Sequence, residues 1–367
     1  MIEIGRRRFV ALGVGAAVLA VAGPRRSAGG ECRVRLVGAV DRERLEASGI
    51  VPYDLAKLRD TITPSDDFFV RSHMGVPYVR QARLEISGHV ARPAAWSLDD
   101  LRRLPRREAA VTLECAGNSL VQAEGLVSTA RFGGCALADL LDRVGASSAE
   151  DEIVFTGADS ASEGGEHYAR SMKMRQAVAE GAFLAWEMNG AALSADHGAP
   201  LRLVVPGWYG MASVKWLERI ELRAEPFRGR FQTEWYVNRV RAADGSIRIE
   251  PVTRLGVKSV VAAAEARAAG AVRLHGAAWG GEGGIARVEA TVDGGRTWRP
   301  AALEGRPTSN VWRLWHFDWK PAAGSYVVAA RAFDAAGAAQ PLSRPPELAE
   351  AAYTRNEVVG RKLEVTC

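Results

Sequence analysis

The sequence predicts an α+β domain followed by an immunoglobulin-like β-sandwich, and three observations support this fold class. The chain has 367 residues, a length that favours two domains over one. Strand-like and helix-like segments alternate irregularly in the first part, which favours an α+β arrangement over a doubly wound sheet. After about residue 250, strand-like runs broken by Gly and Asp-Gly turns follow one another without a good helical segment. We therefore place the domains at residues 31–248 and 249–367.

Two short helices are predicted in the first domain. Ser97 and Asp100 can form a capping box, which predicts a helix through residues 98–104. Between residues 135 and 144 apolar side chains recur at helical spacing, and Gly145 follows as the residue that ends the helix.

The strands of the first domain are predicted from short runs of β-branched, aromatic and other apolar residues. These runs are residues 83–90, 111–113, 152–157, 183–188, 201–207 and 214–223. Cys115 follows the run at 111–113 directly, and Gly117-Asn118 after it is typical of a turn. A side chain at the end of a strand is held by a rigid element and can reach a cleft. The thiol is therefore either a small buried hydrophobic group or a reactive thiolate.

The second domain reads as a series of strands. The strand-like segments are residues 271–281, 285–301, 311–320 and 324–337, with a hairpin expected at Asp293-Gly294. We interpret residues 240–254 as the connection between the domains, and the Gly-rich stretch 279–284 as a turn. The aromatic run in the third segment alternates imperfectly and is interpreted as sandwich core and interface; it comprises Trp312, Trp315, Phe317 and Trp319.

Residues 1–30 are expected to be a targeting segment. They carry a formal charge of +4 out of the net +5, from Arg6, Arg7, Arg8, Arg25 and Arg26 against Glu3. The apolar run 9–22 is too short and too rich in Gly and Ala for a stable membrane span. The arginine pair followed by Phe9 resembles a twin-arginine export signal, which implies a periplasmic or otherwise exported protein. The alternative is a poor N-terminal anchor helix.

The chain after residue 30 is nearly neutral, which argues against nucleic-acid binding.

The four cysteines are scattered over the chain, at positions 32, 115, 135 and 367. There is no CxxC and no CxxCH, which excludes the usual structural zinc spacings and covalent c-type haem. Export would permit disulfides, but this spacing does not indicate a disulfide framework. Cys32 lacks the preceding apolar residues of a lipoprotein, and Cys135 is interpreted as core packing.

The segment ECAGN at residues 114–118 resembles the molybdenum-binding loop of the sulfite oxidase family. Other segments match the family in the same order: FFVRSHMGVP (68–77), VSTARFGG (127–134), WEMNG (186–190), DHGAPLRLVVPG (196–207), VKWL (214–217), VEATVDGGRTW (288–298) and WRLWHFDW (312–319). Ser72 stands where the family usually has Asn. The resemblance runs from about residue 50 to the C-terminus, and several segments in register make it specific.

The resemblance implies molybdenum held by molybdopterin, a pyranopterin dithiolene, with one protein thiolate as a further ligand. A soft thiolate suits a metal already bound to sulfur, and Cys115 is the matching residue. The pterin carries a phosphate and many hydrogen-bonding edges, which suit guanidinium and imidazole groups. The residues that match the family's cofactor contacts are Arg71, His73, Cys115, Asp159, His197, Arg202 and Lys215. Taken singly, residues of these types are more often surface or capping residues, and the Asp159 segment matches only in its Asp-Ser core.

Arg71 matches the family's active-site arginine, which faces the substrate, and Tyr236 matches a tyrosine beside the metal-bound oxygen. The pair Trp-Tyr at that place could equally be interface packing. Two departures weaken the expected anion pocket: residues 119–126 lack a basic residue and a tryptophan, and Ala351 stands where the family often has arginine, with Arg355 out of register. Loss of one buried charge-assisted contact costs about 1.5–3 kcal/mol, roughly one to two orders of magnitude in affinity.

Three functions are compatible with these residues. The leading hypothesis is an exported molybdenum oxidoreductase that oxidises sulfite to sulfate and passes electrons to a separate acceptor, a c-type cytochrome. An alternative is an oxotransferase of the same fold that reduces a sulfoxide or an N-oxide, which the weakened anion pocket favours. The third is a non-catalytic scaffold in which the β-sandwich serves binding or dimerisation. The resemblance also implies a homodimer formed through the second domain.

Overall fold

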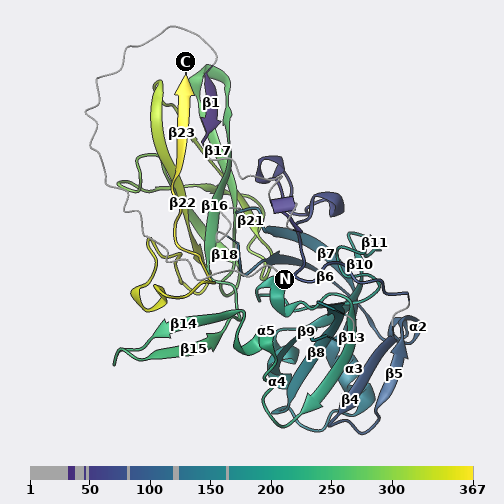
Figure 1. The fold of residues 1–367 in the computed structure, drawn as a ribbon. Helices are drawn as coiled ribbons and strands as arrows, with labels where there is room; N and C mark the ends of the chain where they lie inside the picture. The colour runs from purple at the N-terminus through teal and green to yellow at the C-terminus, as the bar shows by residue number, and fades with distance from the viewer. Residues whose placement is uncertain are drawn as a thin grey trace.

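The computed structural model describes residues 32–37, 45–46, 49–80, 83–118, 124–162 and 165–366 (Figure 1). The predicted signal segment at residues 1–30 lies outside the described residues, as do Cys367 and most of the shortened loop 119–126. No helix in the described ranges is long and apolar enough to cross a membrane.

Two five-stranded sheets form the first domain. The first sheet has the order β11-β10-β7-β6, with β12 paired to β10, and contains β6 (Arg106–Glu114), β7 (Val127–Ala136), β10 (Phe183–Met188), β11 (Ala191–Ala192) and β12 (Arg202–Val204). The second has the order β5-β4-β13-β8-β9 and contains β4 (Arg83–Gly88), β5 (Ala94–Ser97), β8 (Glu152–Ser160), β9 (His167–Lys173) and β13 (Leu217–Arg223). All six predicted strands are therefore confirmed, with shifted ends, whereas β5, β7, β9 and β11 were not predicted.

The helices and 3-10 turns of the described chain are short. They are α2 (Leu98–Arg102), α3 (Leu137–Val144), α4 (Met174–Ala179), α5 (Arg230–Thr233) and the 3-10 turns η1 (Leu55–Lys57), η2 (Ser65–Asp67), η3 (Gly210–Ala212), η4 (Ala268–Gly270) and η5 (Pro346–Leu348). The capping box of Ser97 and Asp100 is confirmed, and Gly145 ends α3 with φ of 66°. The prediction that Cys135 begins a helix is wrong, because β7 continues through Ala136; the thiol is fully buried in the core, as expected.

The second domain is a sandwich of two sheets (Figure 1). One sheet has the order β1-β23-β22-β18-β19, from β1 (Arg33–Leu36), β18 (Ile285–Thr291), β19 (Arg299–Pro300), β22 (Gly324–Asp334) and β23 (Arg361–Thr366). The other has the order β16-β17-β21-β20, from β16 (Lys258–Ala266), β17 (Val272–Trp279), β20 (Ala302–Leu303) and β21 (Arg313–Trp319). That the sandwich is of immunoglobulin type stays a prediction.

Two segments depart from the predicted domain division. β1 precedes the first domain in sequence but pairs with β23, so residues 33–36 belong to the second domain's sheet. Cys32, beside it, is disulfide-bonded although the spacing of the cysteines indicated no disulfide framework.

The predicted connection at 240–254 forms most of a hairpin of β14 (Val237–Arg241) and β15 (Ile247–Pro251), which projects near the junction of the domains (Figure 1). The remaining short pair is β2 (Ile50–Val51) with β3 (Val70–Arg71).

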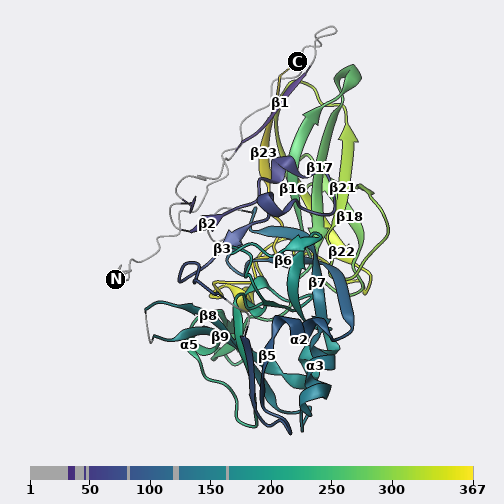
Figure 2. The same ribbon diagram turned by 90° about the vertical axis from the view of Figure 1, so that its right-hand side faces the viewer.

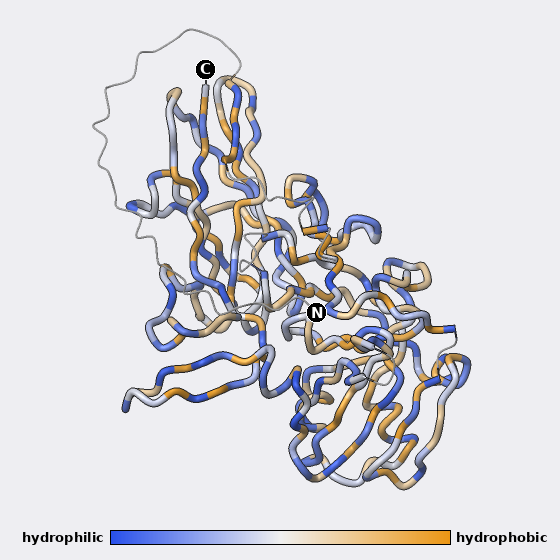
Figure 3. The backbone as a smooth tube through the Cα atoms, in the orientation of Figure 1, coloured by the Kyte–Doolittle hydropathy of each residue, from blue (hydrophilic) through white to orange (hydrophobic). Residues whose placement is uncertain are grey.

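The two domains share a hydrophobic core. Figure 2 shows the β-sandwich standing against the β6–β7 end of the first domain, and Figure 3 shows apolar and polar stretches alternating along the strands. Trp279 and Trp312 of the second domain belong to the core cluster of the first. Trp312 also donates from its indole Nε1 to the carbonyl of Thr61 at 2.7 Å. The junction is therefore a packed interface, and residues of the second domain lie close to the loops of the first.

Candidate active site

One cavity of the first domain brings together all eight site residues that the sequence predicts. It opens to solvent, and its empty volume, counted with the space at its mouth, is about 720 Å³. Its walls include Arg71, His73, Cys115, Asp159, His197, Arg202, Lys215 and Tyr236. These residues come from six separate segments of the chain, so the cavity is a product of the tertiary fold.

Cys115 lies at the point where β6 ends and a tight turn begins. Its backbone N–H donates to the carbonyl of Leu126 at 2.9 Å, and its own carbonyl accepts from the N–H of Asn118 at 2.8 Å. Burial raises the pKa of the Cys115 thiol, while the N–H of Gly117 and the charge of Arg71 act in the opposite direction. A thiol that is buried in this way is poorly ionised by itself and becomes a good ligand when a cation stabilises its thiolate.

Two cationic side chains of the cavity, Arg202 and Lys215, donate to backbone carbonyls and not to carboxylates. Arg202 is 4% exposed and donates to the backbone carbonyls of His197 at 3.0 Å and Ser213 at 3.2 Å. The Lys215 ammonium donates to the carbonyl of Asp196 at 2.7 Å. Neither side chain forms an ion pair within the part of the chain that the structure describes. Burial lowers the pKa of Arg202 to about 10, and burial together with Arg202 lowers the pKa of Lys215 to about 7.

The backbone of Gly198 packs closely against Lys215. Gly198 adopts φ of +99°, and a Cβ built there would lie 2.9 Å from the Cβ of Lys215. Only glycine combines this backbone conformation with such a close approach. The neighbouring His197 is 6% exposed, and its Nε2 lies 3.1 Å from the carbonyl of Ser65, to which it donates. Burial lowers the pKa of His197, so its ring is neutral and its Nδ1 is left as an acceptor.

Asp159 is the one carboxylate of the predicted set. Its side chain is 5% exposed, and its Oδ1 has no hydrogen-bond partner among the described residues. Burial raises its pKa to about 6. A buried carboxylate oxygen without a donor is costly unless a bound group supplies one.

Arg71, His73 and Tyr236 form a chain of polar contacts along one wall. The Arg71 Nη2 lies 3.0 Å from the His73 Nδ1, and the His73 Nε2 contacts the Tyr236 hydroxyl. A guanidinium can only donate, so Nδ1 must be an acceptor and the proton of the neutral ring lies on Nε2. Burial and then Arg71 lower the pKa of His73 to about 4, which keeps the ring neutral. The Tyr236 oxygen therefore accepts from His73, and its own O–H is free to donate into the cavity.

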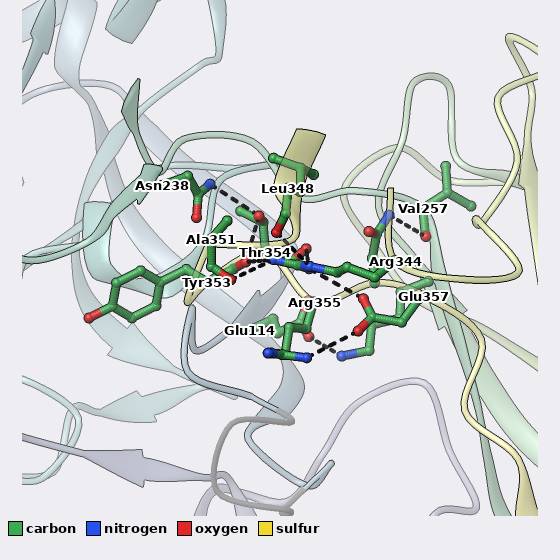
Figure 4. Close-up of polar contacts among 12 residues, drawn as sticks. Glu114, Asn238, Val257, Arg344, Leu348, Ala351, Tyr353, Thr354, Arg355 and Glu357 are labelled. Atoms are coloured by element: carbon green, nitrogen blue, oxygen red, sulfur yellow. Dashed lines mark hydrogen bonds and ion pairs between the residues drawn. The ribbon is translucent and has the colours of Figure 1, made fainter. Parts of the chain in front are cut away.

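Sequence reasoning missed a loop of the second domain that lies against Tyr236. We call residues 344–357 the Arg344 loop (Figure 4). The Tyr353 ring lies 5.2 Å from the Tyr236 ring, between centroids. The loop is organised by Arg344, which donates to the carbonyls of Leu348, Ala351, Tyr353 and Thr354. No local pattern marks this arrangement, because an arginine that binds backbone carbonyls has no sequence signature.

The second predicted departure, Ala351 with Arg355 out of register, lies in the same loop; the first, at residues 119–126, lies mostly outside the described residues. Ala351 is buried, at 2% exposed, and offers no charge. The Arg355 guanidinium donates to Glu357 at 3.3 Å (Figure 4). The cationic groups that line the cavity are thus Arg71, Arg202 and Lys215.

These residues fit an anionic, pterin-like group. The cavity offers unpaired cations, a neutral imidazole acceptor and an orphaned buried carboxylate oxygen, which suit a phosphate and the N–H edges of a pterin. The described residues contain no group of three or more His, Cys, Asp or Glu side chains that could hold a metal ion alone. A single thiolate would therefore act together with ligands that a cofactor supplies.

Comparison with protein families gives two matches. A family described as an oxidoreductase molybdopterin binding domain matches residues 73–231. A second, described as a Mo-co oxidoreductase dimerisation domain, matches residues 246–349. Tyr236 and Tyr353 lie outside both ranges.

Similar proteins agree with these matches. Sulfite oxidase of Gallus gallus is 35% identical over 318 residues, which cover 78% of this chain and 69% of that protein. Mitochondrial sulfite oxidase of Homo sapiens is 36% identical over 285 residues, so that the chain spans about half (52%) of that relative. Among solved structures, the sulfane dehydrogenase SoxCD from Paracoccus pantotrophus aligns with a TM-score of 0.76 at 28% identity, covering 85% of this chain and 84% of that chain.

Proposed function

Since this chain belongs to the sulfite oxidase family of molybdopterin oxidoreductases, we propose that it oxidises sulfite to sulfate and passes the electrons to an external c-type cytochrome. The enzyme class and the molybdenum cofactor follow from the family. The observation that carries the choice of substrate is the wall of Arg71, His73 and Tyr236 beside the Cys115 thiol. It offers a positive charge and a hydroxyl donor to a small oxyanion.

The cofactor would be held by groups of different chemistry. Cys115 supplies the thiolate for the metal, and Arg202 and Lys215 supply charge for the pterin phosphate. Asp159 accepts from a pterin N–H, which would satisfy its orphaned oxygen. When bound, the molybdenum centre supplies an oxygen atom for transfer to sulfur and accepts two electrons.

The protein residues bind and orient the substrate. Arg71 attracts sulfite and lowers the cost of removing its water, because its charge is only partly exposed to solvent. The Tyr236 hydroxyl donates to a sulfite oxygen, and its pKa lies well above 10 because of burial, so the phenol stays a donor at neutral pH. His73 donates to that phenol oxygen and thereby fixes the direction of the Tyr236 O–H.

We infer further that the protein is a homodimer and is exported. The dimerisation family matched at residues 246–349 supports a two-fold assembly through the second domain. The arginine pair at Arg6-Arg7 supports export to the periplasm through the twin-arginine route.

A steady-state assay of the full chain from a molybdenum-replete host tests the proposal. We expect sulfite to reduce ferricyanide and cytochrome c, and Arg71→Met to raise KM by about 10-fold to 100-fold. Molybdenum-loaded protein that is inactive with sulfite but reduces sulfoxides with reduced viologen would instead support the oxotransferase alternative.

One observation favours a second candidate substrate, a sulfane sulfur. A similar solved structure is a sulfane dehydrogenase, of which the chain covers 84% with a TM-score of 0.76. The neutral Ala351 and the Tyr353 ring beside Tyr236 also suit a less charged sulfur group. The same assay with a cysteine persulfide as electron donor separates the two: a higher kcat/KM for the persulfide than for sulfite would favour the sulfane.

A further inference from the structure

We propose that Lys258 and Trp279 of the second domain are positioning residues for Cys115, acting through the carboxylate of Glu114. The inference rests on the proposed role of Cys115 as the molybdenum ligand. It gives the second domain a part in the metal site that is separate from dimerisation.

Strand register turns these two side chains toward the first domain. Lys258 and Trp279 are direct partners across β16 and β17. Alternate residues of a strand share a face, so Lys258 lies on the same face as Val260. Val260 and Trp279 pack in the core of the first domain, whereas Val261 packs in the sandwich core. The pair therefore stands on the inner side of the interface between the domains.

Lys258 and Trp279 both donate to the carboxylate of Glu114, which is itself fully buried. The Lys258 ammonium donates to Glu114 Oε1 at 2.9 Å, and the Trp279 indole donates to Glu114 Oε2 at 2.8 Å. Glu114, Lys258 and Trp279 are each 1% exposed. Both oxygens of the carboxylate are thus fixed by groups from the second domain, and the charge is neutralised away from water.

The fixed carboxylate is linked to the turn that carries Cys115. Glu114 directly precedes Cys115, and its Oε1 also accepts from the Asn118 side chain at 2.9 Å. Asn118 in turn accepts from the N–H of Leu126 with its Oδ1 at 3.2 Å. The Cys115 N–H donates to the carbonyl of the same Leu126 at 2.9 Å. Glu114 and Asn118 thus close the turn at both ends, and the direction of the thiol depends on them.

A purely structural role of the Lys258–Glu114 ion pair and a positioning role for Cys115 predict different cysteine accessibilities when Lys258 is replaced. A structural pair stabilises the whole interface, so its loss exposes both free cysteines through global unfolding. If Lys258 positions the 114–118 turn, its loss leaves the buried Glu114 charge without a cation and opens that turn first. Cys135 is fully buried on β7 and serves as the internal reference.

The test compares four forms of the full chain: wild type, Lys258→Met, the charge-neutral double variant Glu114→Gln with Lys258→Met, and the control Lys362→Met. Lys362 also belongs to the second domain, but its ion pair with Glu364 is exposed. Cofactor-free protein is treated with iodoacetamide, and the alkylation rates of Cys115 and Cys135 are followed by peptide mass spectrometry. Protein from a molybdenum-replete host is examined for metal content and for the Mo(V) electron paramagnetic resonance spectrum.

We expect Lys258→Met to raise the Cys115 alkylation rate at least tenfold, with Cys135 unchanged, and to lower the metal content. The double variant should return the rate to within about threefold of wild type, since Glu114 then carries no charge that needs Lys258. The inference would be overturned if Cys115 were alkylated at the same rate in Lys258→Met as in wild type, or if the rates at Cys115 and Cys135 rose in parallel. If Lys258→Met does not fold, Trp279→Phe decides: a threefold or larger rise at Cys115 alone supports the inference, and no change refutes it.

The failure of the proposed function is recognised separately. If Cys115→Ser retains full molybdenum content, the ligand assignment is wrong whatever the alkylation rates are. If Cys115→Ser loses the metal while Lys258→Met and Trp279→Phe keep wild-type alkylation and metal content, the ligand assignment stands and only the positioning role is refuted.

Discussion

Replacing Arg344 with methionine removes the cation around which the Arg344 loop folds (Figure 4). The guanidinium donates to carbonyls at 2.8 Å (Ala351), 2.9 Å (Tyr353), 3.0 Å (Thr354) and 3.1 Å (Leu348). It also pairs with Glu357 at 3.3 Å, and the two side chains are 15% and 17% exposed. Methionine keeps most of the apolar stem and none of these donors.

The expected cost follows from the burial of this pair. A hydrogen bond to a charged group contributes about 1.5–3 kcal/mol, but carbonyls of a surface loop regain water when the donor is lost. Removal of one partner of a fully buried ion pair costs about 3–5 kcal/mol, but this pair is partly buried and Glu357 keeps Arg355 as a partner at 3.3 Å. We expect Arg344→Met to lower the free energy of unfolding by about 2–3 kcal/mol, which leaves a folded protein.

The consequence for the active site comes through Tyr353. Its ring packs on Tyr236, so a loosened loop misplaces the phenol of Tyr236, which lines the cavity. We expect kcat/KM with sulfite to fall about tenfold, which corresponds to about 1.4 kcal/mol of lost positioning. Urea unfolding and steady-state kinetics measure the two effects on one preparation.

A matched control is Arg331→Met, which removes a half-buried arginine of the same domain that donates to one carbonyl, that of Gln340, at 2.8 Å. We expect a loss of about 0.5–1.5 kcal/mol there and unchanged kinetics. The reasoning is refuted if Arg344→Met destabilises the protein no more than Arg331→Met. It is also refuted in its second step if stability falls but kcat/KM does not.

Three further predictions concern the cavity. Cys115→Ser should reduce the molybdenum content at least tenfold while the circular dichroism spectrum is unchanged; full metal content would exclude the thiolate as ligand. Asp159→Asn should stabilise the cofactor-free chain at pH 7 by about 1–3 kcal/mol, because burial raises the pKa of Asp159 to about 6, yet lower the retention of the pterin. Burial and Arg71 lower the pKa of His73 from 6.5 to about 4, so between these pH values the unfolded chain binds a proton that the folded chain does not. The free energy of unfolding of the cofactor-free chain should therefore fall by about 1–3 kcal/mol as the pH drops from 6.5 to 4, and His73→Asn should lose this part of the slope in urea titrations.

Local signals in the sequence predicted the parts of the fold that depend on neighbouring residues. The capping box at Ser97 and the glycine that ends α3 act within one helical turn, and both are confirmed. The eight site residues were assigned from motifs in register, and they meet in one cavity because each motif lies at the end of an element or in a tight turn. Their individual roles stay predictions.

Contacts between distant segments could not be predicted in this way. The pairing of β1 with β23 joins residues near opposite ends of the chain, and no pattern within β1 indicates its partner. Lys258 reaches Glu114 across 144 residues, and Trp279 reaches it across 165. A lysine at the start of an apolar strand reads as a solvated end, and only the register of β16 shows that it faces a buried carboxylate.

These distant contacts share one consequence for the assembly of the site. The second domain binds Glu114, beside Cys115, through Lys258 and packs Tyr353 on Tyr236, so the proposed metal ligand and the phenol beside it both adjoin contacts between the docked domains. A cavity of this kind takes its final shape only after the whole chain has folded. A cofactor that binds there is then retained by folded protein, which is the state that a twin-arginine route transports. The proposed export through the signal at Arg6-Arg7 would then require that folding and cofactor binding come first.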